Sequence, residues 1–270
     1  MDKILILGAS GFIGTVLYKE LCNYYDTYGT YHTGKIYSGN KHYIHFDMDN
    51  DDILPILIEL KPTVIVSALR GNFESQIETH IQISEYANST MCKVIFLSSA
   101  NVFDAFSNYP SYEFDKTLSE SKYGRLKIRI ENMLMRFPKK NYVIARLPMV
   151  FGNGSPRIRE LMSALKHKDA YEVFPHLVMN VTCVNKLALQ LHYIINRNKR
   201  GTYHLGSSDL VHHDEFILEL AKKMGYPKPL LKRVYTSNFD RFLAVLPKDK
   251  LLPKHLRFTH LDIIEELKLS

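Results

Sequence analysis

Residues 3–14 read KILILGASGFIG, a short apolar run followed directly by three glycines spaced three residues apart. The apolar run predicts a buried strand over Lys3–Leu7, and Ile13, Leu17 and Leu21 then recur at helical spacing. A strand, a glycine-rich turn and a helix in this order form the local context in which backbone N–H groups hold a pyrophosphate. The stretch therefore predicts a dinucleotide site at the start of an α/β fold.

Each glycine of this stretch has a predicted task. Gly8 permits the tight turn, Gly11 lets the backbone approach a pyrophosphate, and Gly14 lets the helix pack closely on the strand. The N–H groups at the helix start would bind the phosphates. The candidate cofactor contacts here are Gly8, Ser10, Gly11, Phe12, Ile13 and Gly14.

Strand-like and helix-like segments alternate through the first 150 residues. The expected strands are Lys3–Leu7, Tyr28–His32, Tyr43–Phe46, Pro62–Ser67, Lys93–Leu97 and Tyr142–Ala145. This alternation predicts an α/β protein with a doubly wound parallel sheet of the Rossmann type. Beyond Gly152 the alternation loosens, so we expect an NADP-binding Rossmann-type domain over residues 1–152 and a smaller α/β substrate lobe, intertwined with it, over residues 153–270.

The residues after the second strand bear on the choice of cofactor. An acidic residue there would favour NAD, whereas this chain has His32, Thr33 and Lys35, whose hydroxyl and basic groups suit the 2′-phosphate of NADP. Asp47, after the third strand, is expected either near the adenine or at the cap of a helix that begins near Asp51. Ala68 and Arg70 follow the fourth strand, at the sheet edge where ligands of such folds bind.

A tyrosine and a lysine four residues apart, Tyr123 and Lys127, lie in a segment that reads as helix and so share one face of it. An ammonium beside a phenol favours the ionised form of the phenol, which makes Tyr123 a candidate proton donor to a carbonyl oxygen. Ser99, after the fifth strand, could hydrogen-bond the same oxygen. Lys127 could also hold the ribose hydroxyls of a nicotinamide cofactor, which itself carries the hydride.

Together these motifs resemble the extended short-chain dehydrogenase/reductase family. Residues 96–104 (FLSSANVFD), the segment 146–152 (RLPMVFG) and the segment 201–206 (GTYHLG) are similar to segments of dTDP-4-dehydrorhamnose reductases. The resemblance implies that Ser99, Tyr123 and Lys127 are catalytic and that Pro148 lies on the nicotinamide side.

The chain also departs from that group at the positions that lie near the sugar in the family. Ala100 and Asn101 replace an Asp-Tyr pair, and Met149 replaces a tryptophan. Arg70, Asn101 and Met149 are the candidate substrate contacts. Redox chemistry on a nucleotide-linked 4-keto-deoxysugar is the expected activity, and another carbonyl compound stays open as the substrate.

Charge, hydropathy and cysteine content bear on other possible functions and on the location of the protein. The net charge is +7, but Lys and Arg are spread along the chain without a nucleic-acid motif, so no nucleic-acid partner is expected. The apolar runs are too short for a membrane span, and the start of the chain lacks the features of a signal peptide, so we expect a cytoplasmic protein. Three scattered cysteines and twelve histidines form no spaced ligand set, so no metal is expected. His212 and His213 are expected at a helix start, and Asp104 and Asp115 in turns or caps.

The sequence leaves alternatives open. An epimerase or dehydratase that retains NAD keeps the same cofactor site, although the segment from His32 to Lys35 disfavours NAD. A non-catalytic NADP-binding regulatory subunit is allowed by the altered positions near the sugar, whereas the complete set of Ser99, Tyr123 and Lys127 disfavours it. Arg70 and Arg146 could each meet a phosphate, make a structural ion pair or be solvated. A homodimer is an open expectation for the assembly.

Overall fold

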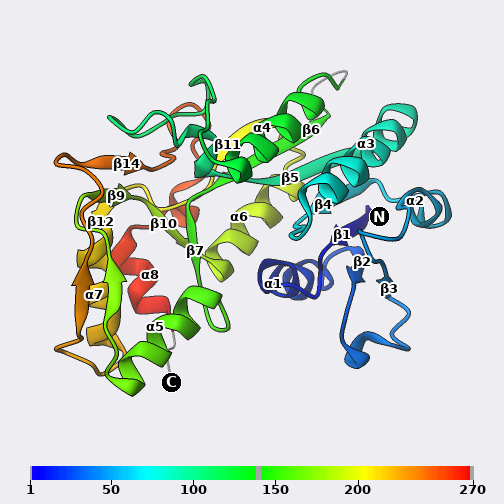
Figure 1. Cartoon of the computed structure of the whole chain (residues 1–270). Coiled ribbons are helices and arrows are strands. Elements are labelled where there is room, and N and C mark those ends of the chain that lie inside the picture. Colours follow the sequence, from blue (N-terminus) through cyan, green and yellow to red (C-terminus); the bar gives the residue numbers. More distant parts are fainter. Residues whose placement is uncertain (1, 138–140, 268–270) are drawn as a thin grey trace. The chain divides into compact units, whose positions relative to one another are not determined.

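The structure is a computed structural model that describes residues 2–137 and 141–267 (Figure 1). It divides into two compact units, which alternate along the chain. Unit 1 comprises Met1–Ser99, Ser121–Ala145 and Ala188–Tyr203, and unit 2 comprises Ala100–Glu120, Arg146–Leu187 and His204–Ser270. Unit 1 thus takes in a segment well beyond the expected boundary at residue 152.

Unit 1 is built around a seven-stranded sheet with the strand order β11-β6-β5-β4-β1-β2-β3. The strands are β1 (Lys3–Leu7), β2 (Asp26–Tyr31), β3 (Tyr43–His45), β4 (Val64–Ser67), β5 (Lys93–Ser99), β6 (Tyr142–Leu147) and β11 (Gly201–His204). The pairs β1–β2, β1–β4, β2–β3 and β4–β5 are all parallel. The strand order reverses between β1 and β4, which is the arrangement of a doubly wound sheet and confirms the predicted fold class.

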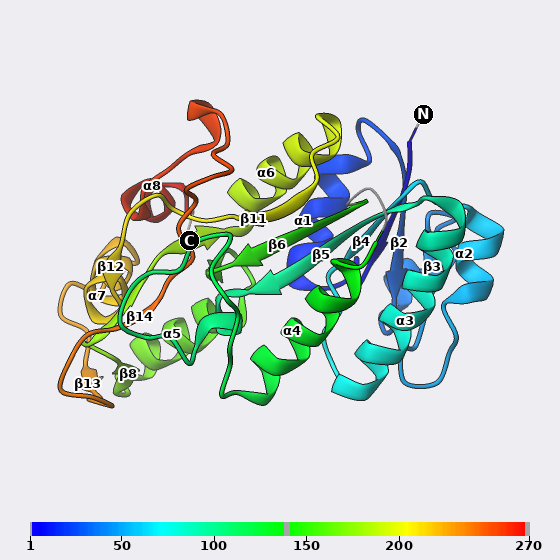
Figure 2. The same ribbon diagram turned by 90° about the horizontal axis from the view of Figure 1, so that it is seen from above.

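Helices cover both faces of this sheet. They are α1 (Phe12–Leu21), α2 (Leu54–Leu60), α3 (Phe73–Thr90), α4 (Lys122–Leu134) and α6 (Val184–Asn196). α1 and α6 lie on one face, whereas α3 and α4 lie on the other (Figure 2). Nδ1 of His192 on α6 lies 2.6 Å from Oε1 of Glu20 on α1, so a polar contact joins the two helices of the first face.

The central strand β1 explains why the opening apolar run is continuous rather than alternating. Residues 4–7 are all 0% exposed, because helices cover the sheet on both sides. A strand buried on both faces has no position for a polar side chain. Leu5 and Leu7 belong to the main core of unit 1, together with Phe96 of β5 and Leu126 and Ile130 of α4.

Unit 2 has short strands and three helices. The strands are β7 (Met149–Phe151), β8 (Tyr171–Val173), β9 (Leu177–Met179), β10 (Val181–Cys183), β12 (Val211–His212), β13 (Leu231–Arg233) and β14 (Arg241–Leu243). They form three small sheets: β10-β7, β12-β9-β14 and β13-β8. The helices are α5 (Pro156–His167), α7 (His213–Lys223) and α8 (His260–Glu266). Phe151, Phe216 and Ile263 are among the residues of its separate core.

The structure differs from the sequence-based expectations in three places. The helix expected near Asp51 begins at Leu54, because residues 47–51 are held in a turn and Pro55 favours the first helical positions. The last helix spans His260–Glu266 instead of residues 261–269, and residues 268–270 lie outside the described ones. The sequence predicts an α/β lobe but not the positions of the unit 2 strands, since strands of two or three residues show no periodicity.

A buried carboxylate ties two segments of unit 2 together. Glu113 is 3% exposed, and its carboxylate accepts hydrogen bonds of 3.1 to 3.3 Å from the backbone N–H groups of Lys248, Asp249 and Lys250. Without the carboxylate, these N–H groups would need water as their hydrogen-bond acceptor. The carboxylate therefore holds the loop of residues 248–250 against the segment that carries Glu113.

Glu113→Ala is therefore expected to lower the free energy of unfolding by about 3 kcal/mol, because it leaves three backbone donors without their charged acceptor. Urea denaturation followed by circular dichroism measures the change. Glu160→Ala, at an exposed position of α5, is the matched control and should change stability by less than about 0.5 kcal/mol. Equal effects of the two substitutions would contradict this role of Glu113.

Candidate active site

The glycine-rich turn between β1 and α1 has no room for side chains at two of its glycines. A Cβ on Gly14 would lie 2.1 Å from the carbonyl oxygen of Gly8, which is far inside van der Waals contact. Gly8 has a φ of +78°, and a Cβ there would lie 3.0 Å from the carbonyl oxygen of Ala68. The structure thus brings Ala68, at the carboxyl end of β4, next to the turn.

The start of α1 fits a diphosphate. Gly11 is its N-cap, and no side chain caps the helix there. A Cβ on Gly11 would meet only the Gly8 oxygen, at 3.2 Å. A ligand can therefore approach the backbone N–H groups closely on the outer side of the turn. Ser10 precedes the N-cap, and Phe12 and Ile13 are the first helical residues. These residues are the ones that could hold the diphosphate of the predicted dinucleotide.

The predicted adenosine side lies at the ends of β2 and β3. His32 follows β2 with its side chain 61% exposed, and its Nε2 lies 3.5 Å from a carboxylate oxygen of Asp47. Thr33 is exposed beside it, and Lys35 opens the short 3-10 helix η1 (Lys35–Tyr37); the Lys35 side chain is outside what the structure describes.

The alternative in which Asp47 caps a helix is wrong. Its carboxylate accepts hydrogen bonds from the Asn50 side chain at 2.8 Å and from the Asp49 backbone at 3.1 Å, and α2 begins only at Leu54. These hydrogen bonds lower the pKa of Asp47, with a smaller contribution from His32. The carboxylate therefore stays ionised beside the end of β2.

Tyr123 and Lys127 lie on α4, whose N-cap Ser121 accepts a hydrogen bond from the Gly124 backbone at 3.0 Å. Tyr123 is 39% exposed, whereas Lys127 is only 4% exposed. The ammonium of Lys127 lies 5.5 Å from the centre of the Tyr123 ring. The predicted pair is therefore one phenol at the surface and one buried cation beneath it.

The buried ammonium of Lys127 is held against β5. Its Nζ donates a hydrogen bond of 3.2 Å to the carbonyl oxygen of Leu97 and lies 4.6 Å from the centre of the Phe96 ring. Ser99 ends the same strand two residues after Leu97 and is partly exposed. The three predicted catalytic residues therefore belong to α4 and β5, two packed elements of unit 1.

Burial lowers the pKa of Lys127 to about 8. The carboxylate of Glu131 acts in the opposite direction and Arg70, which follows β4, adds to the lowering. The exposed Arg70 is thus in electrostatic reach of Lys127. A lysine with this pKa is still mainly protonated at neutral pH and can donate hydrogen bonds.

Two buried polar residues of this region escaped the sequence analysis. Glu131 is 1% exposed and accepts a hydrogen bond of 2.5 Å from the hydroxyl of Ser98. His80 is 0% exposed, its Nε2 lies 2.9 Å from the Ser67 hydroxyl, and burial lowers its pKa to about 4. Glu131 had a signal in the sequence, since it stands four residues after Lys127 on the same helix face. His80 had none.

The other predicted contacts belong to unit 2. Asn101 lies in the 3-10 helix η2 (Ala100–Phe103), Pro148 separates β6 from β7, and Met149 is the first residue of β7. Pro148 is buried, and Met149 and Asn101 are partly exposed. A Cβ on Gly206 would lie 2.6 Å from Cγ of Pro148, so these two segments pack closely.

Arg146 is buried and makes contacts that stabilise the fold of unit 2. It is 1% exposed, donates a hydrogen bond of 3.1 Å to the carbonyl oxygen of Glu113, and its guanidinium carbon lies 4.8 Å from the centre of the Phe103 ring. Asp115 accepts a hydrogen bond of 2.7 Å from the Tyr112 backbone within a local turn, as predicted. Asp104 also lies in a turn, but its carboxylate accepts a hydrogen bond of 2.7 Å from the backbone of Glu120, sixteen residues later in the chain. His212 is the N-cap of α7, as predicted, and His213 is its first residue.

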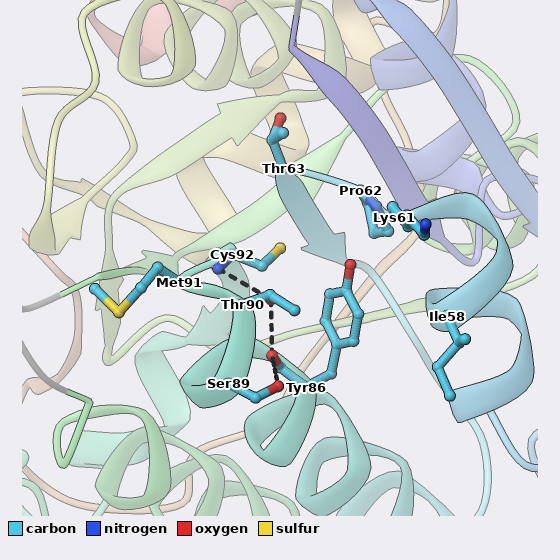
Figure 3. Close-up of a pocket in the computed structure, with 9 residues that line it drawn as sticks. All are labelled: Ile58, Lys61, Pro62, Thr63, Tyr86, Ser89, Thr90, Met91 and Cys92. Carbon is cyan, nitrogen blue, oxygen red and sulfur yellow. Dashed lines mark hydrogen bonds between the residues drawn. The ribbon is translucent and has the colours of Figure 1, made fainter.

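A pocket of 470 Å³ lies at the opposite edge of the sheet, where β4 and β5 begin (Figure 3). It is lined by Ile58, Lys61, Pro62, Thr63, Tyr86, Ser89, Thr90, Met91 and Cys92. The hydroxyls of Ser89 and Thr90 already donate to the carbonyl oxygen of Tyr86. The pocket contains none of the predicted site residues.

Within 2–137 and 141–267, no helix combines the length and apolarity needed to cross a bilayer. The same ranges hold no group of three or more His, Cys, Asp or Glu side chains that could bind a metal ion.

Known proteins share the sequence pattern and the fold. A sequence model of the family described as RmlD substrate binding domain matches residues 70–250, more than half of the chain. The protein named methionine adenosyltransferase 2 subunit beta, from Bos taurus, is 20% identical over 256 residues, which cover 87% of this chain and 76% of that protein.

Two solved structures illustrate the shared fold. A dTDP-4-dehydrorhamnose reductase from Bacillus anthracis, in complex with NADP, is similar with a TM-score of 0.80 at 17% identity over 98% of each chain. A dTDP-glucose 4,6-dehydratase from the same organism, in complex with NAD, is similar with a TM-score of 0.77 at 15% identity over 98% of this chain and 97% of that one.

The glycine turn supports a stability test. Gly14→Ala is expected to lower the free energy of unfolding by about 2–3 kcal/mol, because the added Cβ would force α1 away from the Gly8 carbonyl. Gly11→Ala, where the nearest atom would be at 3.2 Å, is the control and should cost clearly less. Urea denaturation measures both, and an equal loss would show that α1 does not pack as closely as described.

The buried Lys127 predicts a pH dependence of stability. Its pKa is about 8 in the folded chain and about 10.5 when unfolded, so between these values the unfolded chain binds more protons and stability rises with pH. Relative to Lys127→Met, the wild-type protein should gain about 2 kcal/mol between pH 7.5 and pH 9.5. Urea denaturation at both pH values measures the difference in stability between the two proteins. Burial also lowers the pKa of Lys93 to about 8, but Lys93 is present in both proteins, so its contribution cancels in this difference. A constant difference between the two proteins would contradict the burial of a charged Lys127.

Proposed function

We propose, from the premise that the chain belongs to the RmlD substrate binding domain family, that it is an NADP(H)-dependent reductase of a nucleotide-activated 4-keto-deoxysugar. The observation that carries the proposal is the pairing on α4 of an exposed phenol, Tyr123, with a buried ammonium, Lys127, 5.5 Å from its ring. Such a pair suits proton transfer to a carbonyl oxygen that becomes an alkoxide. The glycine turn at the same edge of the sheet supplies a place for the dinucleotide.

The residues of the proposed site have different tasks. Tyr123 donates its proton to the substrate oxygen, and the Ser99 hydroxyl donates a hydrogen bond to that oxygen. Lys127 keeps a positive charge beneath the phenol, favours the phenolate that remains after transfer, and holds the ribose hydroxyls. The nicotinamide, when bound, supplies the hydride.

The preference for NADP is proposed from the end of β2. His32, Thr33 and Lys35 provide basic and hydroxyl groups without an acidic residue in that segment. Nε2 of His32 lies 3.5 Å from a carboxylate oxygen of Asp47, and its side chain is 61% exposed, so the imidazole is accessible to a 2′-phosphate. The similar solved reductase contains NADP and the similar dehydratase contains NAD, so both cofactors must be compared.

The substrate is proposed as a class only. Asn101 and Met149 offer an amide and a flexible thioether where the resembling reductases carry a tyrosine and a tryptophan. The replacements favour a sugar that differs from dTDP-4-dehydrorhamnose. Arg70 is exposed near Lys127 and could meet a phosphate or carboxylate of such a substrate.

A second candidate function is that of a non-catalytic NADP-binding subunit of another enzyme. The observation in its favour is the likeness, over 87% of this chain, to a protein named as the beta subunit of a methionine adenosyltransferase. The complete set of Ser99, Tyr123 and Lys127 favours catalysis instead.

Oxidation of NADPH, followed by absorbance with a panel of nucleotide 4-keto-sugars, tests the reductase. Tyr123→Phe is expected to lower kcat by about 10²–10⁴-fold, because the proton donor is lost while the ring remains. Tyr24→Phe, at an exposed position after α1, is the matched control and should keep full activity.

Three outcomes would contradict the reductase. They are no turnover across the panel, an active Tyr123→Phe variant, and an absorbance spectrum of the purified protein that shows tightly retained NAD. The last outcome would favour an epimerase or dehydratase. Tight NADP binding without turnover, together with co-purification of a partner enzyme, would favour the subunit.

A further inference from the structure

The carboxylate of Glu131 lies in the core of unit 1, where an acidic side chain requires an explanation. It is 1% exposed, and the hydroxyl of Ser98 on β5 donates to it at 2.5 Å. Burying a carboxylate is costly unless a charge or several hydrogen bonds compensate it. The ammonium one helical turn earlier, on Lys127, supplies such a charge, since residues four apart share a helix face.

Lys127 in turn has neighbours on several elements of unit 1. Tyr123 and Glu131 face it from α4, and the Phe96 ring and the Leu97 carbonyl oxygen face it from β5. His80 acts on it from α3 and Arg70 from the loop after β4.

These neighbours have different effects on the charge of Lys127. Arg70 is a like charge and disfavours the ammonium, and His80, whose pKa is lowered to about 4, is neutral at pH 7. The Leu97 oxygen and the Phe96 ring favour the ammonium but carry no net charge. Glu131 brings a full opposite charge, and its effect is to favour the protonated lysine.

We propose that Glu131 is a positioning residue of the proposed reaction, which keeps Lys127 protonated so that Lys127 can assist Tyr123 and hold the cofactor ribose. Ser98 orients the Glu131 carboxylate from β5. The inference rests on the proposed function for the tasks of Lys127, but the coupling of Glu131 to Lys127 is a separate property of the folded chain. Glu131 acts through Lys127 and need not touch either substrate or cofactor.

The test uses Glu131→Gln, which keeps the shape and a hydrogen-bonding oxygen for Ser98 but removes the charge. The protein is labelled with carbon-13 at the lysine ε position, and Lys127 is assigned by the signal that disappears in Lys127→Met. We expect the Lys127 signal of Glu131→Gln to titrate about one pH unit lower than that of the wild type. The affinity for NADPH, measured by fluorescence at each pH, should begin to fall at a correspondingly lower pH.

Two variants control this experiment. Glu85→Gln makes the same chemical change at an exposed position of α3 and should leave the Lys127 titration unchanged. Glu131→Asp keeps the negative charge and should restore most of the shift. An unshifted Lys127 in a folded Glu131→Gln protein would overturn the proposal, because a purely structural role would not move this titration.

If Glu131→Gln does not fold, the wild-type protein still decides. With carbon-13 at the glutamate carboxyl, the Glu131 signal should show a small step over the pH range in which Lys127 titrates. The absence of this step would overturn the proposal. Turnover with an unshifted Lys127 contradicts this inference alone, whereas a shifted Lys127 without turnover contradicts the reductase alone.

Discussion

The burial of one ammonium determines the arrangement of the candidate active site. A charged lysine that is 4% exposed has lost most of its hydration, so the surrounding elements must replace it. β5 contributes the Leu97 carbonyl and the Phe96 ring, and α4 contributes Glu131. These partners hold α4 at a fixed position on β5. Tyr123, one turn nearer the helix start, is thereby placed at the surface with the charge beneath it.

Close packing of backbone connects the glycine-rich turn between β1 and α1 to the sheet. Gly14 allows α1 to approach within a distance that no side chain permits, and the Gly8 turn packs against the backbone of Ala68 at the end of β4. The Gly8 N–H donates to the Thr30 hydroxyl on β2 at 2.9 Å, which ties the turn to the neighbouring strand. The turn, the end of β4 and the end of β2 therefore form one rigid edge of unit 1. A ligand bound there would meet preformed backbone donors.

Much of unit 1 could be predicted because its signals are local. The glycines follow a strand directly, Tyr123 and Lys127 share one helix, and the apolar run of β1 reports a strand buried on both sides. The strands of unit 2 could not be predicted, since their two or three residues carry no period and their pairing joins distant segments, as in β9 with β14. The role of Asp47 was open between a place near the adenine and a helix cap, because a carboxylate that follows a strand suits both; that it organises a local turn came from the structure. His80 became visible only when its burial and its Ser67 partner were known. Glu131 had a signal in its spacing from Lys127, but its burial and its Ser98 partner came from the structure.

The residues that match the motifs of the reductases and the residues that differ from them lie in different units. Tyr123, Lys127, Glu131 and the glycine turn all belong to unit 1, and the charges among them are balanced within its core. Asn101 and Met149, which differ from the residues of the reductases, belong to unit 2. They are partly exposed, and neither side chain carries a charge. A substitution in the first set leaves a buried charge or a steric overlap, whereas one in the second set changes only the shape and polarity offered to a ligand. A chain of this family can therefore exchange the residues proposed to contact the substrate while those proposed to transfer the proton stay intact, which is the pattern that this sequence presents.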